Sequence, residues 1–260
     1  MAPGPPPASL AALAERAARA AGALLLEHAA RGFAEVMTKS SSTDMVSAAD
    51  VASEQLIAEL LEAERPHDAR LGEEGGHRAG TSGLTWIFDP LDGTTNYLYG
   101  LPQWCVSIAV GDGGGLAAGC VFDPSRDECF TAWRGGGTWL NGRPVAVSGA
   151  ADLSRALVAT GFSYDAGRRV EQAHDAVAVI RHVRDLRRLG AAALDLAWVA
   201  CGRLDGYYET GLNPWDIAAG MLLVREAGGT VTADPFGDAG DELIVAATPA
   251  LHGPLRALLP

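Results

Sequence analysis

WIFDPLDGTTNYLYG, residues 86–100, carries a strand, a turn and the start of a helix in one short stretch. The apolar triplet Trp86–Phe88 predicts a strand that delivers Asp89 to the edge of a sheet, where Pro90 forces a turn. Asp92 follows soon after Asp89, so the turn directs both carboxylates toward one point. Two carboxylates at one point are suitable oxygen ligands for a hard cation such as Mg²⁺.

The residues after this turn favour an anion site. Gly93, Thr94 and Thr95 open a helix, and the free backbone N–H groups at a helix start suit a phosphate. The stretch therefore predicts a phosphate-binding site beside a cation site.

Two other acidic segments extend this pattern. Glu73 lies in the Gly-flanked loop 72–75, and Asp216 begins an apolar helix. Taken alone, Glu73 fits a solvated loop and Asp216 fits a helix cap. Combined with the first pair, they predict a cluster of carboxylates whose mutual repulsion divalent cations would relieve.

Three segments, in this order and spacing, resemble signatures of the inositol monophosphatase family. They are GEE (72–74), WIFDPLDGTTNY (86–97) and NPWDIAAGMLLVREAGG (213–229). The segments TKSSSTDMVSAAD (38–50) and RRLGAAALDLAWVACGRLDGYYE (187–209) are also similar to family segments. The resemblance covers about residues 10 to 250 and specifies the superfamily better than the substrate.

The resemblance implies two or three Mg²⁺ ions and a set of ligands for them. These ligands would be Glu73, Asp89, the Leu91 carbonyl, Asp92 and Asp216. The same comparison implies an in-line attack on phosphorus by an activated water, with no covalent phosphoenzyme.

Further roles follow from the resemblance. Thr94 and Asp50, with Glu73, would orient and activate the attacking water. The residues expected to contact the phosphate or the substrate hydroxyls are Gly93, Thr94, Thr95, Ala192, Glu209 and Asp216. Lys39 and Asp44 would lie on a mobile loop that closes over the site. Ala191 departs from the family pattern, because many relatives place Ser or Thr there.

The predicted fold class is α/β, a layered αβαβα sandwich of the inositol monophosphatase type. We expect a disordered leader (1–7), an N-terminal lobe (8–148), a C-terminal lobe (149–260) and a site between the lobes. Apolar periodicity predicts helices at 9–30, 51–64, 168–183, 191–202 and 216–227, with strands at 104–111, 116–123, 128–133, 157–160, 204–209, 230–232 and 243–247. Residues 135–144 read as a turn-rich connection.

Composition limits the partners and the location. The net charge of −12 opposes nucleic-acid backbones and anionic membranes. No apolar stretch is long enough to span a bilayer, and the N-terminus lacks the pattern of a secretory signal. We therefore expect a cytoplasmic protein that binds neither nucleic acid nor membrane.

The favoured function is hydrolysis of inositol 1-phosphate to inositol and phosphate. The same chemistry on histidinol phosphate, fructose 1,6-bisphosphate or a nucleotide 3′-phosphate is the alternative, since the spacing indicates only metal and phosphate. The family resemblance also implies a homodimer and inhibition by lithium.

Two other classes stay open. Haloacid dehalogenase phosphatases also place two aspartates after a strand, but one residue apart and with a lysine downstream. Here Pro90 and Leu91 intervene, and Lys39, the only lysine, lies upstream. Some proteins that resemble the family are regulatory or associate with RNA polymerase, so a non-catalytic role is the second alternative.

Overall fold

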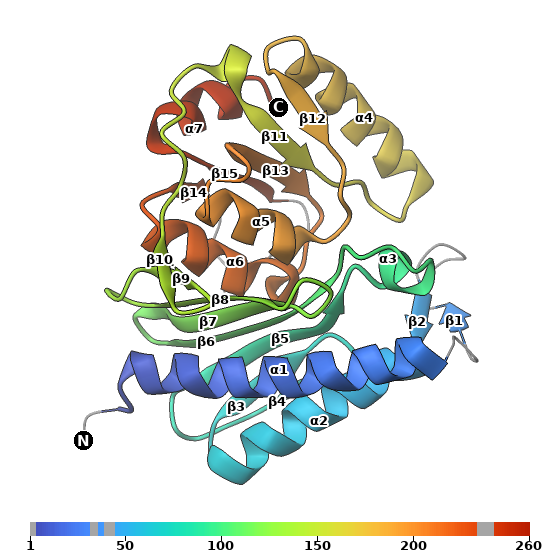
Figure 1. The fold of residues 1–260 in the computed structure, drawn as a ribbon, viewed down its shortest axis with the longest axis vertical. Helices are drawn as coiled ribbons and strands as arrows, with labels where there is room; N and C mark the ends of the chain where they lie inside the picture. The colour runs from blue at the N-terminus through green and yellow to red at the C-terminus, as the bar shows by residue number, and fades with distance from the viewer. Residues whose placement is uncertain (1–3, 32–35, 39–44, 233–241) are drawn as a thin grey trace.

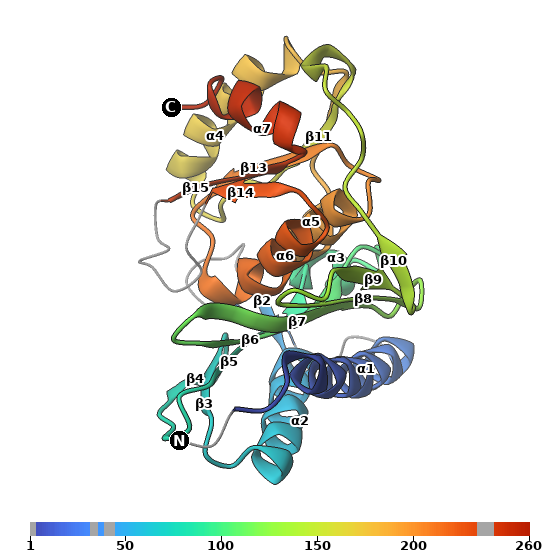
Figure 2. The same cartoon turned by 90° about the vertical axis from the view of Figure 1, so that its left-hand side faces the viewer.

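The computed structural model describes residues 4–31, 36–38, 45–232 and 242–260. Its elements stack in five layers, helices alternating with two β-sheets (Figure 1). The predicted αβαβα sandwich is therefore confirmed. Figure 2 shows the same layers from the side, with the N-terminal helices at one end and the C-terminal helix at the other.

The larger sheet has eight strands in the order β10-β9-β8-β7-β6-β5-β3-β4. Its strands are β3 Ala69–Gly72, β4 Gly76–Arg78, β5 Thr85–Asp92, β6 Cys105–Asp112, β7 Gly115–Asp123, β8 Glu128–Trp133, β9 Thr138–Leu140 and β10 Arg143–Val145. All neighbours pair antiparallel except β3 and β5, which are parallel. This one parallel pair brings the carboxyl ends of two strands, and the residues that follow them, to one edge.

Two long helices cover the outer face of this sheet (Figure 1). They are α1 Pro7–Arg31 and α2 Ala48–Glu64. Apolar residues at helical spacing in α1, including Leu10, Leu13 and Leu25, are buried against the sheet. The ends of both helices lie within three residues of the ends predicted from the apolar periodicity. A small hairpin, β1 Val36–Thr38 and β2 Met45–Ser47, precedes α2.

The smaller sheet has five strands in the order β12-β11-β13-β15-β14. Its strands are β11 Leu157–Thr160, β12 Asp185–Arg187, β13 Gly206–Thr210, β14 Thr230–Thr232 and β15 Leu243–Ala247. Because β11, β12 and β13 run parallel, their carboxyl ends share one edge. Helices α4 Ala166–Ile180 and α7 Pro249–Arg256 lie on its outer side (Figure 1).

The middle layer consists of α5 Ala192–Ala200 and α6 Pro214–Glu226, which lie between the two sheets (Figure 2). Most of their residues are buried in one apolar cluster that reaches both sheets. A helix that is apolar all round belongs in such a core, which explains why α5 lies between the sheets. No helix in the described ranges is long and apolar enough to cross a membrane.

Several short elements escaped prediction. The stretch predicted as a connection, 135–144, contains the hairpin β9–β10. Strands β3, β4 and β12 and helix α7 were also not predicted. These strands are three or four residues long, too short for a periodic signal, and α7 contains Pro254, which normally ends a helix.

The end of β5 differs from the expected sharp turn. Strand pairing continues past Pro90, with Asp89 opposite Ser107 and Asp92 opposite Cys105. The interval therefore holds one more residue on β5 than on β6, which is a β-bulge. Side chains three residues apart in a regular strand point to opposite faces, and the extra residue allows Asp89 and Asp92 to face the same pocket.

Candidate active site

A pocket of about 460 Å³ opens where the carboxyl end of β5 meets the carboxyl ends of β11 and β13. Its size is typical of small-ligand sites. The predicted site residues that line it are Glu73, Asp89, Leu91, Asp92, Gly93, Thr94, Ala192, Glu209 and Asp216. Residues far apart in the sequence are thus brought together by the two sheets.

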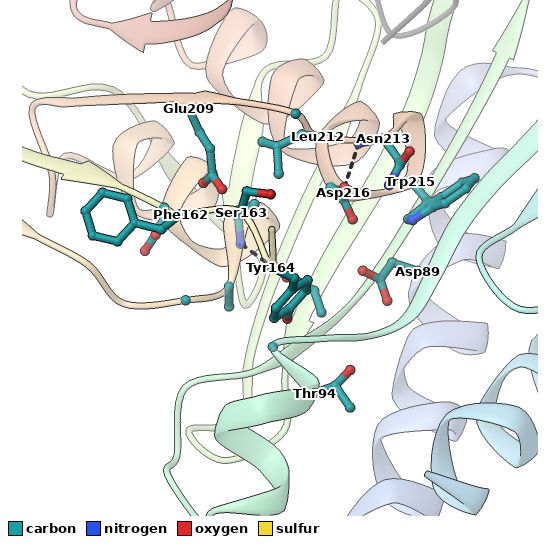
Figure 3. Close-up of a pocket in the computed structure, with 18 of the residues that line it drawn as sticks. Asp89, Thr94, Phe162, Ser163, Tyr164, Glu209, Leu212, Asn213, Trp215 and Asp216 are labelled. Carbon is teal, nitrogen blue, oxygen red and sulfur yellow. Dashed lines mark hydrogen bonds between the residues drawn. The ribbon is translucent and has the colours of Figure 1, made fainter. Parts of the chain in front are cut away.

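Backbone N–H groups orient the three aspartates. Asp89 Oδ1 accepts a hydrogen bond from the Leu91 N–H at 2.8 Å. Asp216 Oδ2 accepts one from the Asn213 N–H at 2.7 Å, at the start of α6. Asp216 therefore fulfils the helix-capping role while its side chain still faces the pocket, where Figure 3 shows it directed toward the same space as Asp89.

Asp92 connects the two halves of the pocket. Its carboxylate accepts the Ala192 N–H at 3.2 Å and the Ala193 N–H at 2.7 Å, which are free groups at the start of α5. The end of β5 is thereby hydrogen-bonded to the first turn of α5, which forms part of the pocket wall.

The carboxylates raise one another's pKa. Burial is the largest cause of the raised pKa of Asp89, and the charges of Glu73, Asp92 and Asp216 add to it. Burial likewise raises the pKa of Asp92 to about 6 and that of Asp216 well above its usual range. Such a group of buried, mutually repelling carboxylates fits a divalent cation.

The described residues contain no group of three or more His, Cys, Asp or Glu side chains already arranged as a metal site. The donor set nevertheless fits Mg²⁺, which prefers carboxylate and carbonyl oxygens and retains water ligands. The required oxygens line one pocket, where they are available to shared ions.

Glu54, which was not predicted as a site residue, holds the turn that carries Glu73. From α2, its buried carboxylate accepts the backbone N–H of Glu74 at 2.8 Å and that of Gly75. A Cβ at Gly72 would lie 2.6 Å from Glu54 Oε1. In the sequence, Glu54 occupies a helix position of α2 that faces the core. Only its contact with the turn in the folded chain shows that it positions Glu73.

The helix start after β5 provides a hydroxyl and a strained turn. Thr94 Oγ1 lies 3.1 Å from Asp50 Oδ1 and 3.0 Å from the Leu91 carbonyl oxygen, so its single hydroxyl hydrogen is shared between these two acceptors. Gly93 has a φ of 92°, a conformation that favours glycine, and a Cβ there would lie 2.9 Å from the Gln103 carbonyl oxygen. The chain can therefore approach a ligand closely at this turn.

The opposite wall comes from the smaller sheet and contains residues that the sequence analysis did not select. Figure 3 shows Glu209 and Phe162 across the pocket from Asp89 and Thr94. A Cβ at Gly161 would overlap the Glu209 carboxylate, so glycine is needed beside it. Glu209 was predicted, whereas four further charged residues of the pocket were not: Asp165, Arg168, Arg188 and Asp195.

Some predicted positions are not pocket-lining. Asp50 is buried behind Thr94 and reaches the pocket through the Thr94 hydroxyl. Thr95 does not line the pocket, and its expected substrate contact stays a prediction. Lys39 and Asp44 lie outside the described residues.

The raised pKa values predict a pH dependence of stability in the metal-free protein. Burial raises the pKa of Glu209 to about 7, so its stabilising contribution is complete below about pH 4.5 and is lost as the pH rises through about 7. A difference of one pKa unit corresponds to about 1.4 kcal/mol of unfolding free energy, and each kcal/mol shifts the Tm of a chain of this size by about 2–4 °C. The Tm measured in EDTA should therefore fall by about 5 °C or more between pH 5 and pH 8.

Thermal denaturation followed by circular dichroism checks this expectation. Glu209→Gln is the matched variant, because it cannot titrate at this position and should show a flatter Tm profile. Identical profiles for the two proteins would contradict the raised pKa of Glu209.

The layered α/β fold and its acidic pocket define a class of proteins of known structure. A solved structure of the extragenic suppressor protein SuhB from Bartonella henselae superposes with a TM-score of 0.89 and 38% identity, covering 96% of this chain and 98% of that one. The model of the inositol monophosphatase family matches residues 7–257. The chain belongs to the inositol monophosphatase family.

Curated relatives carry two kinds of name. The Nus factor SuhB of Xylella fastidiosa is 46% identical over 83% of this chain and 78% of its own length. The inositol-1-monophosphatase SuhB of Mycobacterium tuberculosis is 40% identical over 97% of this chain and 94% of its own length. Membership of this family supports phosphatase activity. The names of the relatives differ, because some name a phosphatase and others a Nus factor.

Proposed function

We propose that this protein is a Mg²⁺-dependent phosphomonoester hydrolase whose preferred substrate is inositol 1-phosphate. The observation that carries the proposal is the convergence of Glu73, Asp89, Asp92 and Asp216 on one pocket. The relatives named as inositol monophosphatases support the choice of substrate.

The proposed metal ligands are Glu73, Asp89, the Leu91 carbonyl, Asp92 and Asp216. When bound, two or three Mg²⁺ ions would supply Lewis-acid stabilisation of the phosphate and acidify water. The chain contributes oriented carboxylates, because Asp89, Asp92 and Asp216 are each fixed by backbone N–H groups.

The remaining roles concern a proton and the substrate. The Thr94 hydroxyl directs its one hydrogen toward Asp50 and Leu91, so its oxygen can accept a hydrogen bond from an attacking water. When that water gives a proton to Thr94, Asp50 can accept the Thr94 hydroxyl proton in turn. The N–H groups of Gly93 and Thr94 would hold phosphate oxygens. Glu209 and the N-terminal turn of α5 at Ala192 would contact the hydroxyls of the alcohol.

Phosphate release from a panel of esters tests the proposal. The panel comprises inositol 1-phosphate, histidinol phosphate, fructose 1,6-bisphosphate and a nucleotide 3′-phosphate, each with Mg²⁺ and with EDTA. We expect Mg²⁺-dependent release, with the highest kcat/KM for inositol 1-phosphate. No release from any ester above the EDTA background would overturn the proposed function.

Glu54→Gln should weaken Mg²⁺ binding. Gln accepts one of the two backbone N–H groups that Glu54 binds at Glu74 and Gly75, and its own NH₂ group faces the other. Loss of one such bond corresponds to about 1–3 kcal/mol, so the Mg²⁺ concentration for half-maximal thermal stabilisation should rise by about tenfold or more. Glu59→Gln, at an exposed position of the same helix, is the control.

An unchanged Mg²⁺ requirement in Glu54→Gln, with only a lower Tm, would show that Glu54 supports the fold and does not position the turn.

A second candidate function follows from the relatives named Nus factor SuhB, at 44–46% identity. This chain would then associate with RNA polymerase, which is the non-catalytic alternative that the sequence left open. A binding titration with purified RNA polymerase, repeated with Asp89→Asn, separates the roles, because a binding function does not need the carboxylate cluster.

The proposal also retains the cytoplasmic location, the homodimer, the two lobes that divide near residue 148 and inhibition by lithium. Lithium would replace one Mg²⁺ near Asp92 and Asp216. Full activity at high millimolar lithium would remove that part of the proposal.

A further inference from the structure

Asp195 lies in the first turn of α5 and contributes to the pocket wall, but none of the roles above uses it. Its side chain is buried, with the residue 1% exposed, and its Oδ1 has no hydrogen-bond partner among the described residues. A buried carboxylate oxygen without a donor is costly. Native proteins rarely retain such a group without a functional reason.

The surroundings of Asp195 place it between the two sides of the pocket. Burial raises its pKa well above the usual range, the charges of Asp92 and Glu209 raise it further, and Arg188 opposes them. Asp92 belongs to the proposed metal side and Glu209 to the opposite wall. Asp195 is therefore close to the position where the alcohol part of an ester would begin.

Arg188 does not supply the missing donor. In the described part of the chain its guanidinium makes one hydrogen bond, a long one of 3.5 Å to the Phe162 carbonyl oxygen. Because Asp195 helps to form the pocket wall, a molecule bound in the pocket can supply the donor.

We propose that Asp195 determines specificity by accepting a hydrogen bond from a hydroxyl on the alcohol part of the substrate, so that the pocket selects phosphate esters of polyols. This inference rests on the proposed phosphatase function and names its substrate class. A polyol ester supplies the donor, whereas an aryl ester without hydroxyls leaves the carboxylate unpaired. A second phosphate at this position would be repelled by Asp195 and Glu209.

The test compares two esters in wild type, Asp195→Ala and Asp195→Asn. Inositol 1-phosphate carries hydroxyls beside the ester, and p-nitrophenyl phosphate carries none. Asp195→Ala should lower kcat/KM for inositol 1-phosphate by about 10- to 100-fold and leave that for p-nitrophenyl phosphate within about threefold. Asp195→Asn retains a carbonyl acceptor and should recover most of the preference.

Stability provides a second readout. Because Asp195 is buried without a donor, Asp195→Ala should have a Tm equal to or above that of the wild type. Glu171→Gln, which removes an exposed charge on α4 outside the pocket, controls for net charge and should behave like the wild type. A lower Tm together with equal losses on both esters would assign Asp195 to the fold and overturn the inference.

Other outcomes are also decisive. A higher Mg²⁺ requirement of Asp195→Ala with both esters would show that Asp195 acts in ion binding. A larger loss on histidinol phosphate than on inositol 1-phosphate would show that Asp195 pairs with an ammonium group of the substrate. Either result overturns the inference. If the wild type hydrolyses neither ester, the proposed function fails. Calorimetric titration of the uncleaved inositol 1-phosphate then still tests Asp195, and an unchanged Kd in Asp195→Ala would contradict its role.

Discussion

Asp89→Asn is expected to lower the turnover of inositol 1-phosphate by about a thousandfold or more. Asp89 is buried at the bulge of β5, and Glu73, Asp92 and Asp216 all act on its pKa. It is therefore the carboxylate best placed to contact more than one ion. Electrostatic stabilisation dominates phosphoryl transfer, so the loss of this charge should affect turnover strongly.

The measurement is Mg²⁺-dependent phosphate release, with Mg²⁺-induced thermal stabilisation as an independent readout. Asp89→Asn should lose both. Asp112→Asn lies at the far end of the neighbouring strand β6, is paired with Arg134 at the surface and should retain both. A loss of turnover below about tenfold in Asp89→Asn would show that Asp89 does not bridge ions.

Thr94→Val should lower turnover by about 100- to 1000-fold with little change in KM. Valine has nearly the same shape but lacks the hydroxyl that connects the pocket to Asp50 at 3.1 Å. Proton transfer assisted by a positioned side chain typically contributes about 10²- to 10⁴-fold. The backbone N–H at this position is unchanged, so phosphate binding should be retained.

Thr94→Ser is the matched variant, because it keeps the hydroxyl and removes only a methyl group. It should stay within about fivefold of the wild type. Similar activities for Thr94→Val and Thr94→Ser would exclude a role for the hydroxyl and leave the backbone of this turn as the relevant group.

These two predictions concern residues that the sequence identifies by their immediate neighbours. Asp89, Asp92 and Thr94 lie within one short stretch, where the strand and the helix start are encoded in adjacent positions, although the bulge between them was predicted as a turn. The positions of the long helices were predicted for the same reason, because apolar spacing within a helix reflects contacts between residues three or four apart.

The short elements were beyond this kind of reasoning. Strand β3 has four residues and β4 has three, yet their hairpin places Glu73 at the site. Their formation depends on pairing with β5, with Gly72 opposite Phe88, and no local pattern predicts that register. The sequence placed Glu73 in a loop, and the sheet shows why that loop lies beside Asp89.

The sequence by itself determined the class of fold and the set of carboxylates, since both are carried by local patterns and by similarity to a family. The tertiary structure decided that Glu54 holds the Glu73 turn, that Gly161 makes room for Glu209, and that the buried Asp195 Oδ1 meets no donor in the part of the chain that the structure describes. Each of these facts depends on how separate layers pack and on which polar atoms lose contact with water. Burial and pairing between distant residues arise only when the whole chain has folded.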